Sequence, residues 1–206
     1  MIVNFRCRET EKIFNGEWSA KLPLLIQKRA KHSTYIEEQL KLYGHPDMER
    51  VIKADWILTK ENTQHDTYLS NSTLVNPSGE VLRLRYEDGN YKFMYKGAAQ
   101  DELLSHRLPH SFAVENSEAK NILESHLVIA GLKKHRLNFR KETRSGEIFT
   151  LHIDDIAELG RFTEIRARGT QDTKHTRELL QLAEELGFKT NSIVNGNYLS
   201  LILGKS

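Results

Sequence analysis

The chain has 206 residues, which is enough for one large domain or one domain with an appendage, and enough to bury a core. Charged residues make up 28% and hydrophobic residues 38%, a balance that excludes a disordered chain, and the apolar runs fall far short of the roughly 20 residues that cross a bilayer. The formal charge of +2 is too small to argue for nucleic-acid binding, so no membrane or nucleic-acid partner is expected.

One cysteine, Cys7, is present, which excludes an intrachain disulfide and a cysteine-based zinc site. No signal-peptide pattern opens the chain. We therefore expect a cytoplasmic protein.

The first 31 residues differ in pattern from the rest. Residues 2–7 alternate as a short strand, residues 8–15 suit one or two helical turns, and residues 24–31 suit the start of another helix. We treat 1–31 as an appended segment, which could supply a strand to the domain that follows.

From residue 32 onward, strands and helices are arranged in two similar halves. Apolar residues at helical spacing predict a helix over 35–43, ended by Gly44. Strands are expected at 51–59, 81–86, 91–96, 134–143, 147–154, 161–168 and 197–203, and further helices at 117–132 and 173–186. This order favours an α+β barrel over a doubly wound sheet, which would need regular alternation of strand and helix.

Two turns predict hairpins. The sequence Glu87-Asp-Gly-Asn90 joins the strands at 81–86 and 91–96, because Asp-Gly supplies the positive φ that a tight turn needs. Arg144-Ser-Gly146 joins the next pair.

The first hairpin has one face that is almost wholly cationic. Arg83 and Arg85 share a face of their strand, and Lys92 and Lys96 share a face of the partner strand. A solvated outer face is the plain alternative. Such faces usually mix signs, because like charges on paired strands repel one another, so the pattern favours an anionic ligand.

The second half repeats this pattern with Lys134 and Arg136, and later strands add His152, Asp154 and Glu164 on their polar faces. If the sheet closes, these faces line one lumen, in which the cations would clamp phosphate oxygens. The carboxylates of Asp154 and Glu164 would then be ligands for Mg²⁺ or Mn²⁺. His152 is the candidate for proton transfer, with a structural role as the alternative.

Several short motifs occur in a specific order from residue 64 to residue 201. They are Gln64-His-Asp-Thr-Tyr68, Leu82-Arg-Leu-Arg85, Tyr91-Lys-Phe-Met-Tyr-Lys-Gly97, Lys134-His-Arg136, Leu151-His-Ile-Asp-Asp-Ile156, Leu159-Gly-Arg-Phe-Thr-Glu164 and Asn197-Tyr-Leu-Ser-Leu201. Over residues 32–206 this series resembles the CYTH domain, the triphosphate-tunnel family of class IV adenylate cyclases and thiamine or inorganic triphosphatases.

The resemblance implies an eight-stranded antiparallel β-barrel with flanking helices. It implies metal binding by Asp154 and Glu164 with Mg²⁺ or Mn²⁺ as cofactor. It also implies a set of triphosphate-binding residues, namely Arg83, Arg85, Lys92, Lys96, Arg107, Lys134 and Arg136.

The chain departs from the family pattern at three places. The first strand of the family carries Glu-x-Glu-x-Lys, and no such string exists here. Leu108, Pro109, His110 and Ser111 stand where glutamates often follow Arg107, and Arg166 stands where a second glutamate follows Glu164. Cations are kept while acids are lost, which favours triphosphate binding and weakens metal loading.

A second resemblance covers only the start of the chain. Residues 1–30 resemble the opening of RelE/HigB-type toxins, which are ribosome-dependent ribonucleases, but the catalytic residues of such toxins have no counterpart here.

Three functions therefore remain open. The first is metal-dependent cyclisation or hydrolysis of a triphosphate such as ATP, thiamine triphosphate or tripolyphosphate. The second is a triphosphate-binding protein with weak catalysis, and the third is a toxin-related module that contacts RNA or a protein. A homodimer is compatible with all three.

Overall fold

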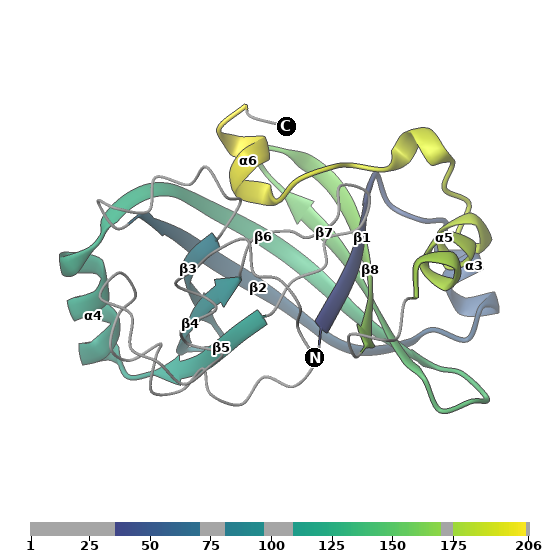
Figure 1. The fold of residues 1–206 in the computed structure, drawn as a ribbon, viewed down its shortest axis with the longest axis horizontal. Coiled ribbons are helices and arrows are strands. Elements are labelled where there is room, and N and C mark those ends of the chain that lie inside the picture. Colours follow the sequence, from purple (N-terminus) through teal and green to yellow (C-terminus); the bar gives the residue numbers. More distant parts are fainter. Residues whose placement is uncertain (1–35, 71–80, 97–108, 170–174, 205–206) are drawn as a thin grey trace, which may run out of the picture.

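The computed structural model describes residues 36–70, 81–96, 109–169 and 175–204. Within these residues, eight strands form one antiparallel sheet in the order β1-β8-β7-β6-β2-β3-β4-β5 (Figure 1). The strands are β1 (Ile36–Tyr43), β2 (Ile57–Ser70), β3 (Val81–Glu87), β4 (Asn90–Lys96), β5 (Pro109–Val114), β6 (Leu127–Glu142), β7 (Ile148–Ile156) and β8 (Gly160–Gly169). The helices are α3 (Met48–Lys53), α4 (Asn116–Ser125), α5 (Thr176–Glu185) and α6 (Tyr198–Ile202), with a 3-10 turn, η2 (Thr190–Ser192).

This architecture confirms the expected eight-stranded antiparallel α+β fold. In the described residues the sheet is not closed by hydrogen bonds, because β1 and β5 remain its two edges.

Both predicted hairpins are confirmed. Asp88 and Gly89 have φ values of 49° and 78°, the positive angles that the turn between β3 and β4 requires. Strands β6 and β7 pair in a register that sets Arg136 opposite Asp154.

The helix predicted over residues 35–43 is wrong, because residues 36–43 form β1 and pair with β8. A spacing of four residues between apolar side chains fits a strand face as well as a helix face. Leu40 and Leu42 are buried on one face of β1, while Glu37 and Lys41 alternate with them on the other. Strand periodicity therefore describes this segment correctly.

The strand predicted at 197–203 is also wrong, because residues 198–202 form α6. Asn197 caps this helix, since its side chain accepts a hydrogen bond from the amide of Ser200, whose hydroxyl accepts from the amide of Asn197. This reciprocal capping starts a helix in a short apolar segment whose composition also suits a strand.

Two predicted segments are divided differently in the structure. The segment 51–59 is divided between α3, which is capped by the Asp47 side chain, and the start of β2 at Ile57. The helix predicted over 117–132 ends at Ser125, and the long strand β6 begins at Leu127.

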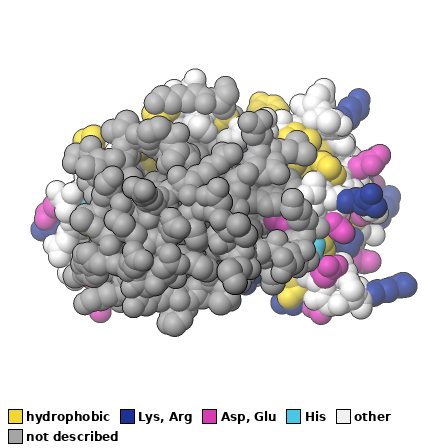
Figure 2. Space-filling model, in the orientation of Figure 1, with side chains coloured by type: hydrophobic (Ala, Val, Ile, Leu, Met, Phe, Trp, Pro, Cys, Tyr) yellow, Lys and Arg dark blue, Asp and Glu magenta, His cyan; other side chains and the backbone are white. Residues whose placement is uncertain are grey.

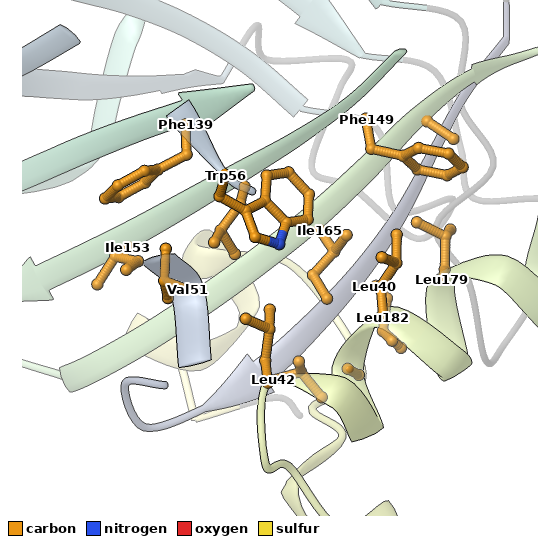
Figure 3. Close-up of a cluster of buried hydrophobic side chains, with 14 residues drawn as sticks. Leu40, Leu42, Val51, Trp56, Phe139, Phe149, Ile153, Ile165, Leu179 and Leu182 are labelled. Atoms are coloured by element: carbon orange, nitrogen blue, oxygen red, sulfur yellow. The ribbon is translucent and has the colours of Figure 1, made fainter. Parts of the chain in front are cut away.

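The outer face of one half of the sheet is covered by α3 and α5. Figure 3 shows apolar side chains from strands and helices meeting there, with Trp56 among the labelled residues. Leu179 and Leu182 of α5 lie against Leu40 of β1 and Ile165 of β8. Helix α4 covers a second cluster over β3 and β4 that contains Leu84 and Phe93.

Among the described residues, the opposite, inner face of the sheet carries its apolar cluster near α6. There Tyr198 and Leu199 of α6 pack with Tyr68 of β2, Leu132 of β6 and Phe162 of β8. One part of the inner face is thus sealed by a helix, and the rest carries polar side chains.

None of the described helices has the length and apolar character needed to cross a membrane. Figure 2 shows basic and acidic side chains intermixed at the end of the molecule that carries α3 and α5. This outer surface therefore mixes charges of both signs.

Candidate functional site

Strand alternation directs a set of charged side chains to the inner face of the sheet. We call it the lumen cluster. Its cations are Lys41, Arg83, Arg85, Lys92, Lys96, Lys134, Arg136 and Arg166, and its acids are Glu37, Asp66, Glu87, Asp154 and Glu164. Eight cations against five carboxylates give these described residues a formal charge of +3.

Asp66 lies at the centre of the first half of the lumen cluster. The guanidinium of Arg85 donates two hydrogen bonds to its carboxylate, at 2.6 and 2.9 Å, and Arg83 donates a third at 2.9 Å. The ammonium of Lys134 lies 3.8 Å from the same carboxylate. Burial alone would raise the pKa of Asp66, but Arg83 and Arg85 hold this pKa below its usual range, so the carboxylate is ionised.

Asp154 has the corresponding place in the second half. Arg136 donates to both of its oxygens, Tyr198 donates its hydroxyl at 2.7 Å, and Lys134 lies 3.7 Å away. Lys134 therefore lies between the two buried aspartates and joins the two halves.

Glu164 is contacted by five side chains, one of which is His152, whose Nδ1 lies 3.8 Å from Oε2. Its Oε1 accepts from Gln39 at 3.0 Å and lies 3.7 Å from Lys41. Its Oε2 accepts from Arg166 at 2.5 Å and from Arg136 at 3.0 Å.

Glu37 connects strands that lie far apart in the sheet. It accepts from Lys96 of β4 at 2.5 Å and from Arg166 of β8 at 3.2 Å. Since β4 lies near one edge of the sheet and β1 forms the other, the Lys96–Glu37 pair spans the gap that backbone hydrogen bonds leave open. The sheet is thus curled around the lumen cluster and bridged by an ion pair.

Glu87 forms a separate group further along β3. It accepts hydrogen bonds from Lys92, from Gln64 at 2.8 Å and from Asn62 at 3.2 Å. The side chain of Lys92 is 43% exposed, whereas that of Lys134 is 1% exposed. Lys92 therefore lies toward solvent rather than in the buried centre.

A cavity of about 40 Å³ opens at the centre of the lumen cluster, with space for a few water molecules. Its lining includes Arg83, Lys96, Lys134, Arg166 and Tyr198. The Nε atoms of Arg83 and Arg166 are buried and donate to no acceptor among the described residues. Buried donors without partners are costly, so an acceptor placed in this cavity would be stabilised.

Burial changes the protonation of two lysines in this cavity. It lowers the pKa of Lys96 to about 8, although Glu37 acts in the opposite direction. It also lowers the pKa of Lys134 well below its usual value, with Arg136 adding to the effect. Both ammonium groups are poorly solvated and gain from an added anion.

His152, the predicted proton-transfer residue, lies beside Arg136 and Glu164. Burial, together with the positive charges of Arg136 and Arg166, lowers its pKa to about 3. The ring is therefore neutral, and its Nδ1 lies 2.9 Å from a guanidinium nitrogen of Arg136. In this state Nδ1 accepts a hydrogen bond and holds Arg136 in place; the proton-transfer role stays a prediction.

Most of the predicted phosphate-binding residues lie together. Arg83, Arg85, Lys134 and Arg136 are linked through two shared aspartates, and Lys96 joins them through Glu37 and Arg166. Lys92 is set apart with Glu87. Arg107 lies outside the described residues, as does the segment 1–31 with its expected strand and toxin resemblance.

Sequence analysis missed Glu37, Gln39 and Lys41, which extend from β1 into the lumen cluster. They form Glu37-x-Gln39-x-Lys41, which differs from the Glu-x-Glu-x-Lys pattern only by Gln39 in place of the second glutamate. The expectation that the chain has nothing comparable is therefore corrected. Alternation of these residues with Leu40 and Leu42 was the available signal. Asp66 lies within the motif Gln64-His-Asp-Thr-Tyr68, but the motif alone predicted no role for its side chain.

The predicted metal ligands do not fit a free divalent cation in this arrangement. Both oxygens of Asp154 and both oxygens of Glu164 already accept hydrogen bonds from protein donors. In the part of the chain that the structure describes, no three His, Cys, Asp or Glu side chains are grouped to hold a metal. The predicted cofactor, Mg²⁺ or Mn²⁺, stays a prediction.

No family model matches the chain. A protein of Methanocaldococcus jannaschii, named as a candidate adenylate cyclase, is 25% identical over 161 residues, which are 75% of this chain and 89% of that protein.

Solved structures resemble the chain over most of its length. PH1819 from Pyrococcus horikoshii has a TM-score of 0.68 and 22% identity, covering 82% of this chain and 99% of that one. A candidate adenylate cyclase from Vibrio parahaemolyticus has a TM-score of 0.67 and 19% identity, covering 84% and 99%. A Hippeastrum protein, described as a candidate adenylyl cyclase with a dominant triphosphatase activity, has a TM-score of 0.58 and 15% identity, covering 84% and 97%.

These likenesses confirm the fold that the CYTH resemblance implied. They give no support to the toxin resemblance of residues 1–30.

Proposed function

We propose that the lumen cluster binds a triphosphate. The observation that carries this proposal is the pair of buried donors, Arg83 Nε and Arg166 Nε, in residues that line one cavity among cations. A linear polyphosphate presents many acceptor oxygens and one or more negative charges on each phosphate, so it suits both the free donors and the excess of positive charge.

Binding would proceed by exchange of partners. The cations that line the cavity already contact carboxylates, so the ligand must take over some of these cations. Lys134 is suited to such exchange, because it lies 3.7 to 3.8 Å from its aspartates, beyond hydrogen-bond distance. Arg85 and Arg136 hold their aspartates with bidentate geometry. They would keep those partners and hold the rest of the lumen cluster in position.

The relatives support a triphosphate over other anions. Proteins of this fold are named as candidate adenylate cyclases, and one is described as having a dominant triphosphatase activity. Both reactions begin with a triphosphate: hydrolysis adds water across its terminal anhydride, and cyclisation joins the ribose 3′ oxygen to the α-phosphate with release of pyrophosphate.

Turnover is the second part of the proposal, and the named relatives are the observation that favours it. The sequence predicts dependence on Mg²⁺ or Mn²⁺, but the carboxylates are engaged by cations, so we propose tight binding with slow turnover. Assays of ATP, thiamine triphosphate and tripolyphosphate with each metal would measure it. Turnover at rates usual for enzymes, about 1 s⁻¹ or faster, would contradict the second part alone.

Calorimetric titration with tripolyphosphate tests binding. We expect the wild-type protein to bind, and Arg83→Met to bind at least about tenfold more weakly, because one charge-assisted contact is lost. Arg140→Met is the matched control, since Arg140 is half-exposed and pairs with Glu142 outside the lumen cluster. A wild-type protein that does not bind, or equal loss in both variants, would refute the proposal.

A further inference from the structure

Arg166 lies where two acidic side chains of the lumen cluster meet. Its guanidinium donates to Glu37 at 3.2 Å and to Glu164 at 2.5 Å, while its Nε has no acceptor among the described residues. The side chain is largely buried and lines the central cavity. One cation is thus held by two carboxylates with a donor left over.

This arrangement is that of a bridging cation. A divalent metal in a phosphate site is held by one or two carboxylates and uses its remaining positions for phosphate oxygens. Arg166 has the same two kinds of contact available, since Glu37 and Glu164 hold it and Nε remains for an acceptor. Its charge is fixed at all ordinary pH values, because burial is outweighed by Glu37 and Glu164 and the net effect raises its pKa.

The residue opposite Arg166 in the sheet supports the interpretation of Arg166 as a bridging cation. Gln39 pairs with Arg166 across β1 and β8 and donates its amide to Glu164 Oε1. A neutral donor therefore stands beside Arg166, and the remaining acidic oxygens are already engaged. Nothing at this point of the described lumen offers a metal two free oxygens.

We infer that the guanidinium of Arg166 takes the place of a divalent metal ion, so that the lumen binds triphosphate without metal. This inference rests on the proposed function. The formal charge of +3 in the described lumen already offsets much of the charge of a triphosphate, and a divalent ion added beside Arg166 would meet like-charge repulsion.

The test is calorimetric titration with tripolyphosphate, in EDTA and again in excess Mg²⁺. For the wild-type chain we expect the two affinities to agree within about threefold. For Arg166→Glu we expect affinity in EDTA to fall by about 100-fold or more, since a buried cationic contact becomes an acidic one, and Mg²⁺ to restore at least about tenfold. Arg166→Gln, which removes the charge and adds none, should lose affinity in EDTA without gaining dependence on Mg²⁺.

Arg161→Glu is the matched control, because Arg161 lies on the same strand, is 68% exposed and pairs with Asp155 outside the lumen cluster. It should bind as the wild type does in both buffers, and circular dichroism should report the fold of each variant. If Arg166→Glu does not fold, the wild-type and Arg166→Gln titrations still test whether triphosphate binding needs Arg166 and is independent of metal.

The outcomes separate the two proposals. A wild-type protein that binds only with Mg²⁺ overturns the role of Arg166 and leaves triphosphate binding intact. Wild-type protein that binds in neither buffer overturns the proposed function itself. Arg161→Glu behaving like Arg166→Glu would show that overall charge, rather than this guanidinium, sets the metal dependence.

Discussion

At the scale of single residues, the lumen cluster is a network in which no cation of the buried centre is far from an acid. Asp66 shows this most clearly, since its side chain is fully buried between Arg83, Arg85 and Lys134. Removing one partner from such a group leaves the others buried and uncompensated, which costs more than the contact itself contributes.

Asp66→Asn should therefore lower the free energy of unfolding by about 3–5 kcal/mol, as measured by urea denaturation. Tripolyphosphate should restore part of the lost free energy of unfolding, because an anion in the lumen replaces the missing negative charge and binds only the native state. The control is Asp155→Asn, an exposed carboxylate paired with Arg161, with an expected change under about 1 kcal/mol. Equal effects of the two variants would contradict the buried network.

Lys96 gives the lumen a dependence on pH. Its pKa is lowered to about 8, so the ammonium begins to lose its proton as the pH rises through 8, while the same lysine in the unfolded chain keeps its proton until above 10. Affinity for triphosphate should fall as the pH rises from about 7 to about 9, because the anion binds the charged lysine.

Titrations of tripolyphosphate at several pH values test this, with Lys96→Met as the comparison. The variant should bind more weakly at pH 7 and show a smaller fall above pH 8. A profile identical in both proteins would assign the pH dependence to another group.

At the scale of elements, the sequence predicted structure correctly where its pattern is compatible with only one type of secondary structure. The β3–β4 and β6–β7 hairpins could be predicted because Asp-Gly and Ser-Gly turns join strands of clear alternation. The segment 36–43 could not be separated from a helix by apolar spacing alone, and the error hid Glu37 and Lys41 from the candidate site. Of the acids that face the cationic hairpin, Glu37 and Asp66 come from β1 and β2. Glu87 lies at the end of β3 itself, where it was assigned only to the turn. The hairpin considered by itself therefore showed most of its cations without partners.

Helix α6 was predicted as a strand, yet it closes part of the lumen. Leu199 is buried with Tyr68, Leu132 and Phe162, and Tyr198 donates its hydroxyl to Asp154. Pairing across strands and helix capping both depend on contacts that no single short segment reveals.

Leu199→Ala should lower the free energy of unfolding by about 2–5 kcal/mol, because it opens a cavity in a packed cluster. Leu203→Ala, one turn further along at a side chain that is 41% exposed, should change it by less than about 1 kcal/mol. Thermal or urea unfolding of the two variants gives the comparison. A Leu199→Ala variant as stable as the wild type would mean that α6 is not packed against the sheet.

At the scale of the whole molecule, the sheet separates two environments. Its outer face packs under α3, α4 and α5 with apolar side chains, and its inner face gathers the ionised groups around one cavity. Strand alternation, the hairpins and the motif series made this division predictable, while the partners of each cation depended on register across neighbouring strands.

We propose that this cavity is the triphosphate site, and a crystal structure with bound tripolyphosphate is the direct test. We predict phosphate oxygens within hydrogen-bond distance of Arg83 Nε and Arg166 Nε, and of the ammonium groups of Lys96 and Lys134. Tripolyphosphate bound elsewhere on the protein, with the lumen cluster unchanged around its carboxylates, would contradict the account.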